Sequence, residues 1–195
     1  MDTNLNNFQL SNSHVDNKVG PNSVPVNIFR SVSSKLPEKA ALSTVAKLAK
    51  LMCSHPMLVD RKEQAKLVTF NTYKQEAESR GTCDIVFAHA VCGDWDKGFD
   101  AAIFERGLAQ LQDAGAQVIA YQTYNHKPEA PRWRIFVFLD EPIAPADYRI
   151  CWEGLNSVFA GKLDGNAKDC ARLNYWPSCP PEQTREFRTL NIEVV

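Results

Sequence analysis

The chain has 195 residues and a mass of 21.9 kDa, which is the size of one globular domain with a short tail. Its 22 basic and 23 acidic residues give a net charge of -1, which excludes a uniformly basic surface for nucleic acid but allows a local basic groove. No apolar run approaches the roughly 18 residues of a membrane helix. The first residues also lack the basic and apolar parts of a signal peptide, so we expect a cytoplasmic protein with no membrane partner.

The first 30 residues are rich in asparagine and serine and show no apolar period. Such a segment buries too little surface to offset its ordering entropy, which predicts a flexible polar arm. Residues 31–195 are then expected to form a single domain. Within it, residues 37–54 predict a helix, because apolar side chains recur at helical spacing and a His-Pro pair follows. The charged segment 61–80 predicts no definite element.

From residue 84 the pattern becomes sharper. The sequence predicts strands over residues 85–91, 118–124, 132–139 and 173–176, with helices over 98–114 and after Pro145. The resulting order of strand, helix, strand, strand, helix, strand (βαββαβ) is typical of RRM-like and ferredoxin-like sheets. We therefore expect an α+β fold with such a core, helices on one sheet face, and an extra N-terminal helical region. The opposite sheet face would be free to carry a site.

Asp94 and Asp96 are the first candidate site residues. In an extended strand they point to the same side, with Trp95 opposite. Two carboxylates held close together favour a cation between them, and hard oxygen ligands select Mg²⁺ or Mn²⁺. The alternative is a solvated turn, since glycine and charged residues flank the pair.

His126 and Lys127 form a second candidate site with the two arginines of the next strand. Arg132 and Arg134 lie two residues apart, so they share one strand face. Guanidinium groups near a histidine and a lysine suit phosphate groups. The alternative is an edge strand that charged side chains keep soluble.

The segment after residue 163 is a third candidate site. It contains Asp164, Asp169, Arg172 and the pair Tyr175-Trp176. Aromatic side chains stack on bases and arginines hold phosphates, so these residues could serve nucleic acid. The alternative is that Asp164 forms a turn and the aromatic residues belong to the core.

Taken together, these motifs resemble those of the archaeo-eukaryotic primase (primase-polymerase) superfamily, and the chain is similar to primase-like replication proteins of plasmids and phages. That superfamily has a DxD, an SxH and a hydrophobic-Asp motif, in this order. The matching segments are Asp94-Trp95-Asp96, Tyr124-Asn125-His126 and Leu163-Asp164. The resemblance covers about residues 84–180, and Tyr124 stands where the family has serine.

The resemblance implies nucleotidyl transfer, in which a 3′-hydroxyl attacks the α-phosphate of a nucleoside triphosphate. It implies that Asp94, Asp96 and Asp164 hold Mg²⁺ or Mn²⁺, with Asp169 as a rival third acid, and that His126 joins them in catalysis. The implied nucleotide-binding residues are His126, Lys127, Arg132, Arg134 and Arg172. The implied partners are a single-stranded DNA template, an NTP or dNTP, and a separate helicase.

Two other functions remain open at this stage. A binding module could keep the primase fold without catalysis, because the second motif is imperfect and the chain is short. It would act in replication initiation by binding DNA or nucleotide. A rolling-circle nicking enzyme is less compatible with the sequence, because neither His89 nor His126 belongs to the histidine pair that this chemistry needs.

Overall fold

The computed structural model of this chain describes residues 23–193. The predicted arm therefore lies outside the described residues up to residue 22. Its last part was predicted wrongly, because residues 23–29 form the strand β1 (Ser23–Phe29). Val24, Val26 and Phe29 of this strand are buried, so the segment has enough apolar surface to be ordered.

Residues 23–193 contain three α-helices and, with β1 included, eleven strands. The helices are α1 (Val45–Ser54), α2 (Ala101–Asp113) and α3 (Tyr148–Val158). The longer strands after β1 are β2 (Lys39–Thr44), β6 (Ile85–Trp95), β7 (Gln117–Gln122), β8 (Trp133–Ile143) and β11 (Phe187–Leu190). The short strands are β3 (Met57–Leu58), β4 (Leu67–Thr69), β5 (Asn71–Tyr73), β9 (Asn174–Tyr175) and β10 (Ser178–Cys179). Short 3₁₀ turns are η2 (Lys62–Gln64), η3 (Thr82–Asp84) and η4 (Gly165–Lys168).

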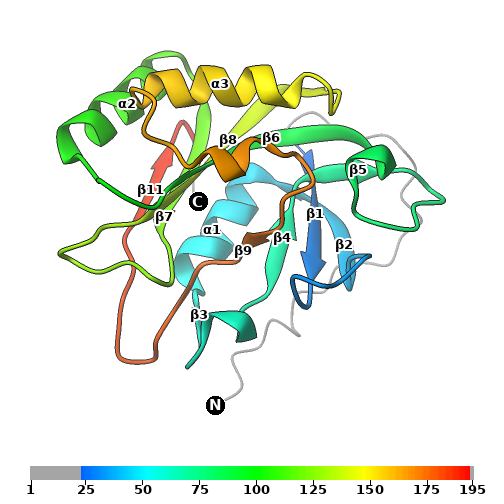
Figure 1. Ribbon diagram of the computed structural model, residues 1–195, viewed down its shortest axis with the longest axis horizontal. Helices are drawn as coiled ribbons and strands as arrows, with labels where there is room; N and C mark the ends of the chain where they lie inside the picture. Colours follow the sequence, from blue (N-terminus) through cyan, green and yellow to red (C-terminus); the bar gives the residue numbers. More distant parts are fainter. Residues whose placement is uncertain (1–22, 194–195) are drawn as a thin grey trace.

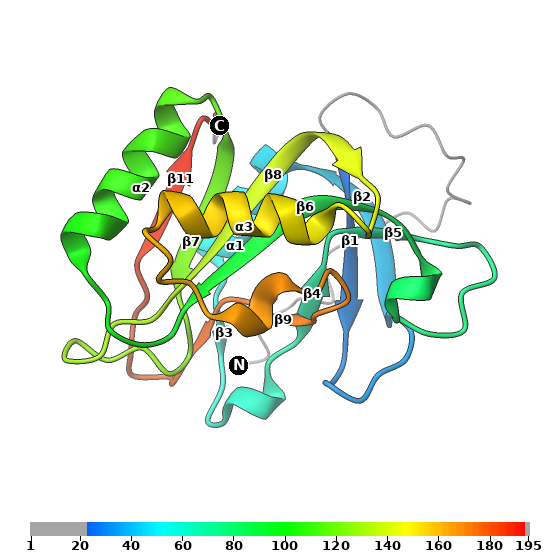
Figure 2. The same ribbon diagram turned by 45° about the horizontal axis from the view of Figure 1, so that its top comes forward.

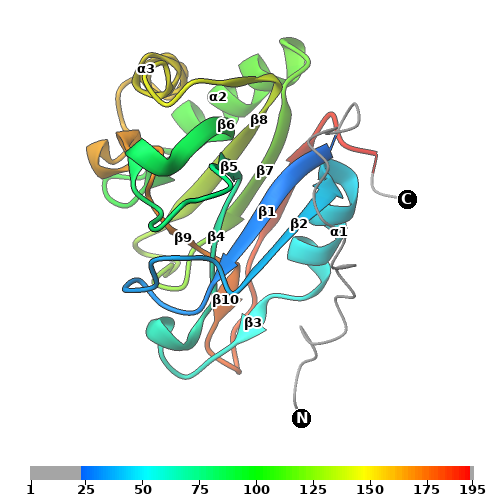
Figure 3. The same cartoon turned by 90° about the vertical axis from the view of Figure 1, so that its right-hand side faces the viewer.

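The centre of the fold is a five-stranded antiparallel sheet with the order β11-β7-β8-β6-β5. Helices α2 and α3 cover one face, as Figures 1 and 3 show. Between them and the sheet lies an aromatic-rich core that includes Trp95, Phe104, Trp152 and Phe159. The predicted coverage of one sheet face by these two helices is therefore confirmed.

The second face of this sheet is not free, which corrects the sequence-based expectation. Helix α1 and a smaller sheet of order β2-β1-β4-β9 pack against it (Figure 3). Met52 of α1 and Phe70 beside β4 meet Phe136 and Phe138 of β8 in a second core. The sequence pattern did not reveal this layer, because all of it except the two-residue strand β9 comes from segments before residue 84.

The predicted RRM-like layout is only partly present. Strands β7, β8 and β6 are neighbours in the expected order, but β9 does not pair with β6. Instead, β5 occupies that edge, and β9 pairs with β4 through Leu67 and Tyr175 (Figure 2). The α+β class holds, whereas the four-stranded layout does not.

The predicted N-terminal helix begins later than expected. Residues 39–44 form β2, which pairs with β1 along its whole length, and only the second half of the prediction is helical. Thr44 marks the boundary, because its side chain accepts a 3.2 Å hydrogen bond from the backbone N–H of Lys47 and so caps α1. No helix within residues 23–193 is both long and apolar enough to cross a membrane.

Candidate phosphate-binding site

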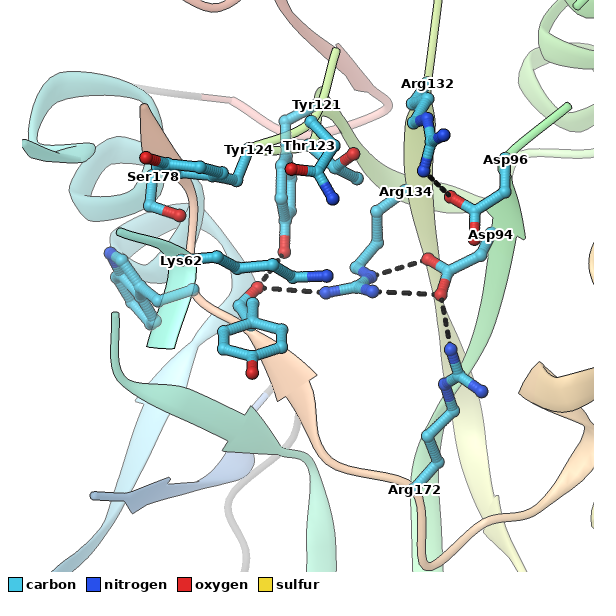
Figure 4. Close-up of a pocket in the computed structure, with 13 residues that line it drawn as sticks. Lys62, Asp94, Asp96, Tyr121, Thr123, Tyr124, Arg132, Arg134, Arg172 and Ser178 are labelled. Atoms are coloured by element: carbon cyan, nitrogen blue, oxygen red, sulfur yellow. Dashed lines mark hydrogen bonds and ion pairs between the residues drawn. The ribbon is translucent and has the colours of Figure 1, made fainter. Parts of the chain in front are cut away.

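A pocket lies between the central sheet and the segment that carries β9 and β10 (Figure 4). Strands β6, β7 and β8 supply one part of its lining, and η2 and the β9–β10 segment supply another. The lining is rich in cations and aromatic rings. It consists of Lys62, Asp94, Asp96, Tyr121, Thr123, Tyr124, Asn125, Arg132, Arg134, Arg172, Tyr175, Trp176 and Ser178.

Strand register explains how the central side chains meet. Arg134 stands directly opposite Asp94 of β6 and opposite Tyr121 of β7. Because side chains alternate along a strand, their neighbours Trp95 and Trp133 point to the other face, into the core under α2 and α3. The expectation that each pair of charged residues shares one face, with tryptophan opposite, is confirmed.

The Asp94 carboxylate is fully engaged by two arginines. Arg134 donates from Nε to Oδ1 at 2.7 Å and from Nη2 to Oδ2 at 2.9 Å, which makes a bidentate pair. Arg172 adds a bond from Nη2 to Oδ2 at 3.2 Å. Asp94 is only 2% exposed. Burial by itself would raise the pKa of this carboxyl, but the charge and hydrogen bonds of Arg134, together with Arg172, hold its pKa below the usual value.

Arg134 also fastens β9 to the central sheet. Its Nη1 donates to the backbone carbonyl of Tyr175 at 3.1 Å, and the hydroxyl of Tyr121 donates to the same oxygen at 2.7 Å. The Tyr175 carbonyl therefore has two donors and its hydrogen-bonding capacity is well satisfied. These bonds hold the β9 side of the pocket against β7 and β8 (Figure 4).

The pocket carries more positive than negative charge. Four of its lining residues are basic and two are acidic, and Asp94 is already paired. The other acid, Asp96, approaches Arg132 only to 3.9 Å. Lys62 extends over the ring of Tyr175, with Nζ 4.6 Å from the ring centroid. Burial and the nearby Arg134 charge lower the pKa of Lys62, as expected where positive charge exceeds negative charge.

The three predicted metal ligands do not share one cluster. The carboxylate of Asp164 caps η4 by accepting from the backbone N–H of Asn166 at 3.1 Å, and only its backbone N–H reaches Asp94, donating to the carbonyl at 2.7 Å. Within residues 23–193, no group of three or more His, Cys, Asp or Glu side chains is arranged to hold a metal ion. Both Asp94 oxygens already accept guanidinium bonds, so Mg²⁺ or Mn²⁺ would have to displace Arg134 or Arg172 to reach this carboxylate. Metal binding by Asp94, Asp96 and Asp164 stays a prediction.

The remaining predicted residues lie outside the pocket lining. His126 follows β7 in a turn, where Nδ1 accepts from the backbone N–H of Arg132 at 3.3 Å. Burial and nearby Arg185 lower the pKa of this imidazole. Lys127 is exposed in the same turn, and the rival acid Asp169 accepts from the backbone N–H of Ala171 at 2.9 Å. The structure thus brings five of the nine predicted residues to this pocket, namely Asp94, Asp96, Arg132, Arg134 and Arg172, while Asp164 lines a second pocket together with Asp96.

Several pocket residues had not been predicted. Lys62 comes from the segment that showed no clear pattern, and nothing in its local sequence points to the site. Tyr121 belongs to a strand that was predicted, and its alternation with Ala120 indicates which face it occupies. Ser178 follows the aromatic pair Tyr175-Trp176, a candidate for nucleic-acid binding, but the sequence does not single out the serine hydroxyl as a site group.

Within residues 23–193, the fold is an α+β domain with three sheets, and its pocket is lined by more basic than acidic side chains. The sequence model of the VapE N-terminal domain matches residues 78–195. The chain therefore belongs to this family, which is associated with phage and plasmid replication. The predicted resemblance to replication proteins of plasmids and phages is confirmed at family level, whereas membership of the primase superfamily stays a prediction.

One solved structure also resembles this chain. It is the AEP domain of the primase-polymerase (PrimPol) of cyanophage S-2L, at 12% sequence identity and a TM-score of 0.42. The alignment covers 90% of this chain and 84% of that one. A comparison with curated proteins finds no match.

Proposed function

We propose that this chain is a primase-like replication domain whose pocket binds a nucleoside triphosphate through its phosphates. The observation that carries the proposal is the excess of positive charge in the pocket. Arg134 and Arg172 neutralise Asp94, while Lys62 and Arg132 add further positive charge that Asp96 offsets only weakly. A polyanion placed there would receive charge-assisted hydrogen bonds from these groups.

Binding without turnover is the function we place first. Both Asp94 oxygens accept guanidinium bonds, so Asp94 acts here as the counter-ion that holds Arg134 in place. In this role Asp94 holds the arginine of a phosphate-binding site in position and does not serve as a metal ligand. Single-stranded DNA and a helicase partner belong to the same replication role and remain proposals.

Nucleotidyl transfer is the second candidate function. The observation that favours it is that Asp94 and Asp96 share one strand face and line the same pocket as the cations. For this function Asp94 would have to give up its bonds to Arg134 and Arg172. The two candidates therefore differ in the role of a single carboxylate, which makes them separable by experiment.

The test is isothermal titration calorimetry of the intact protein with ATP and, separately, with dATP. Removal of one charge-assisted contact costs roughly 1.5–3 kcal/mol, so we expect Lys62→Ala and Arg132→Ala each to weaken binding about tenfold or more. Lys47→Ala, on the exposed surface of α1, is the matched control and should bind like the parent. Absence of nucleotide binding, or equal binding by all variants, would overturn the proposal.

Asp94→Asn separates binding from transfer. It removes negative charge beside the cations, so a binding module should keep or increase its affinity for ATP. A transferase should lose primer synthesis or extension on single-stranded DNA in this variant, while the parent makes product with Mg²⁺ or Mn²⁺. If the parent makes no product under conditions in which a known primase does, the second candidate is excluded.

A further inference from the structure

The pocket has two chemically different sides. Arg132 and Asp96 lie on one side in Figure 4, next to Asp94, and Ser178 lies on the other side beside Tyr124. Lys62 extends between them. One side is thus ionic, whereas the other offers aromatic rings and neutral hydrogen-bonding groups. A bare polyphosphate would use only the ionic side.

Ser178 is the unusual group on the neutral side. Its residue is 1% exposed, and its hydroxyl has no hydrogen-bond partner. Figure 4 shows this hydroxyl pointing into the pocket. Buried polar atoms are almost always paired, because an unpaired one costs about 1–3 kcal/mol. The indole N–H of Trp176, another pocket residue, is also buried without a partner.

Backbone hydrogen bonds on both sides of Ser178 hold this residue at the wall of the pocket. Strand β10 pairs with β3, with Ser178 opposite Met57. On either side, Met57 N–H donates to the carbonyl of Pro177 at 2.8 Å and Val59 N–H donates to that of Cys179 at 3.0 Å. The serine backbone is therefore held in place, and its buried hydroxyl faces the pocket.

We propose that Ser178 recognises the uncharged nucleoside part of the nucleotide, with its hydroxyl bonded to an oxygen or nitrogen of the sugar or base. This inference rests on the proposed function. The phosphates would go to Lys62 and the arginines, and the nucleoside would lie on the neutral side. A serine hydroxyl both donates and accepts, so it suits a sugar hydroxyl and a base edge equally. The pocket should therefore prefer a nucleotide to inorganic tripolyphosphate.

The experiment compares ATP, dATP and inorganic tripolyphosphate by calorimetry on the intact protein and on Ser178→Ala. We expect the variant to lose about three- to tenfold in ATP affinity, the effect of one neutral hydrogen bond, with tripolyphosphate affinity unchanged within about twofold. A loss for ATP but not for dATP assigns the contact to the 2′-hydroxyl, and a loss for both assigns it to the rest of the nucleoside. Ser157→Ala is the matched control, because its hydroxyl bonds to the carbonyl of Glu153 on the exposed face of α3.

Thermal unfolding supplies a second readout. The Ser178 hydroxyl has no partner in the free protein, so Ser178→Ala should be at least as stable as the parent, whereas a structural hydroxyl would lower the melting temperature when removed. The proposal is overturned if Ser178→Ala binds ATP like the parent, or loses ATP and tripolyphosphate equally. If the parent binds neither ligand, it is the proposed function that fails.

Discussion

The Asp94–Arg134 pair offers the sharpest test of the site. Replacing Asp94 with asparagine removes the charge but keeps the shape of the side chain. Arg134 then stays buried without its counter-ion, since Arg134 is itself among the buried residues. Removal of one partner from such a pair costs about 3–5 kcal/mol. The amide oxygen can still accept one bond, so we expect a loss of about 3 kcal/mol in the free energy of unfolding.

Asp96→Asn is the control for this measurement. Asp96 lies two residues along the same strand, but its distance to Arg132 is 3.9 Å and both side chains are about one-third exposed. A pair of this kind contributes roughly 0–1 kcal/mol. The expected difference between the two variants is therefore about 2 kcal/mol or more.

Urea unfolding at pH 7, followed by tryptophan fluorescence and circular dichroism, measures both variants. The pKa of Asp94 in the folded protein lies below its unfolded value, so its stabilisation is present above about pH 4 and disappears only as the pH falls through the folded value. Measurements at pH 7 therefore record the whole contribution. Equal losses for Asp94→Asn and Asp96→Asn would refute the assignment of Asp94 as a structural counter-ion.

Two further predictions concern packing and pH. A Cβ on Gly107 would lie 2.5 Å from Phe159, so Gly107→Ala should lower the free energy of unfolding by about 1–3 kcal/mol through overpacking. A Cβ on Gly154 in α3 would have nothing within 4 Å, so Gly154→Ala should raise the free energy of unfolding by up to about 1 kcal/mol. Urea unfolding of the two variants tests both predictions. Burial lowers the pKa of His89 below 6.5, so the unfolded chain takes up a proton that the folded chain resists, and stability falls as the pH drops below about 6.5. Between about pH 7.5 and 5, the melting temperature of His89→Gln should decrease less than that of the parent. The control is His55→Gln, at an exposed position, and its melting temperature should decrease as much as that of the parent.

The sequence predicted the parts of the fold that depend on local pattern. The period of two along β6 and β8 placed Asp94 and Arg134 on the face opposite Trp95 and Trp133. Helices α2 and α3 were also located, because apolar side chains recur at helical spacing in both, a glycine follows α2 and prolines precede α3. For α2, Asp100 accepts from the N–H of Ile103 at 3.1 Å.

Long-range pairing could not be predicted in this way. The two-residue strand β9 is held by its pairing with β4 and by the hydrogen bonds that Arg134 and Tyr121 donate to the carbonyl of Tyr175. None of these partners is near β9 in the chain. The same holds for Lys62, which reaches the pocket from a short turn. The acids and the arginines were each predicted as site residues, but the pairing of Asp94 with Arg134 and Arg172 was not, because such pairs join distant parts of the chain and the bond from Arg172 to Asp94 spans 78 residues.

The layer formed by α1, β1, β2 and β4 lies before the span that matches the family, residues 78–195. A shortened chain starting at residue 78 would uncover Phe136 and Phe138 and would leave one edge of β6 without β5. Large apolar patches and unpaired strand edges promote aggregation. The segment from residue 23 to residue 77 is therefore part of the minimal folding unit, and expression of residues 78–195 alone should give insoluble protein.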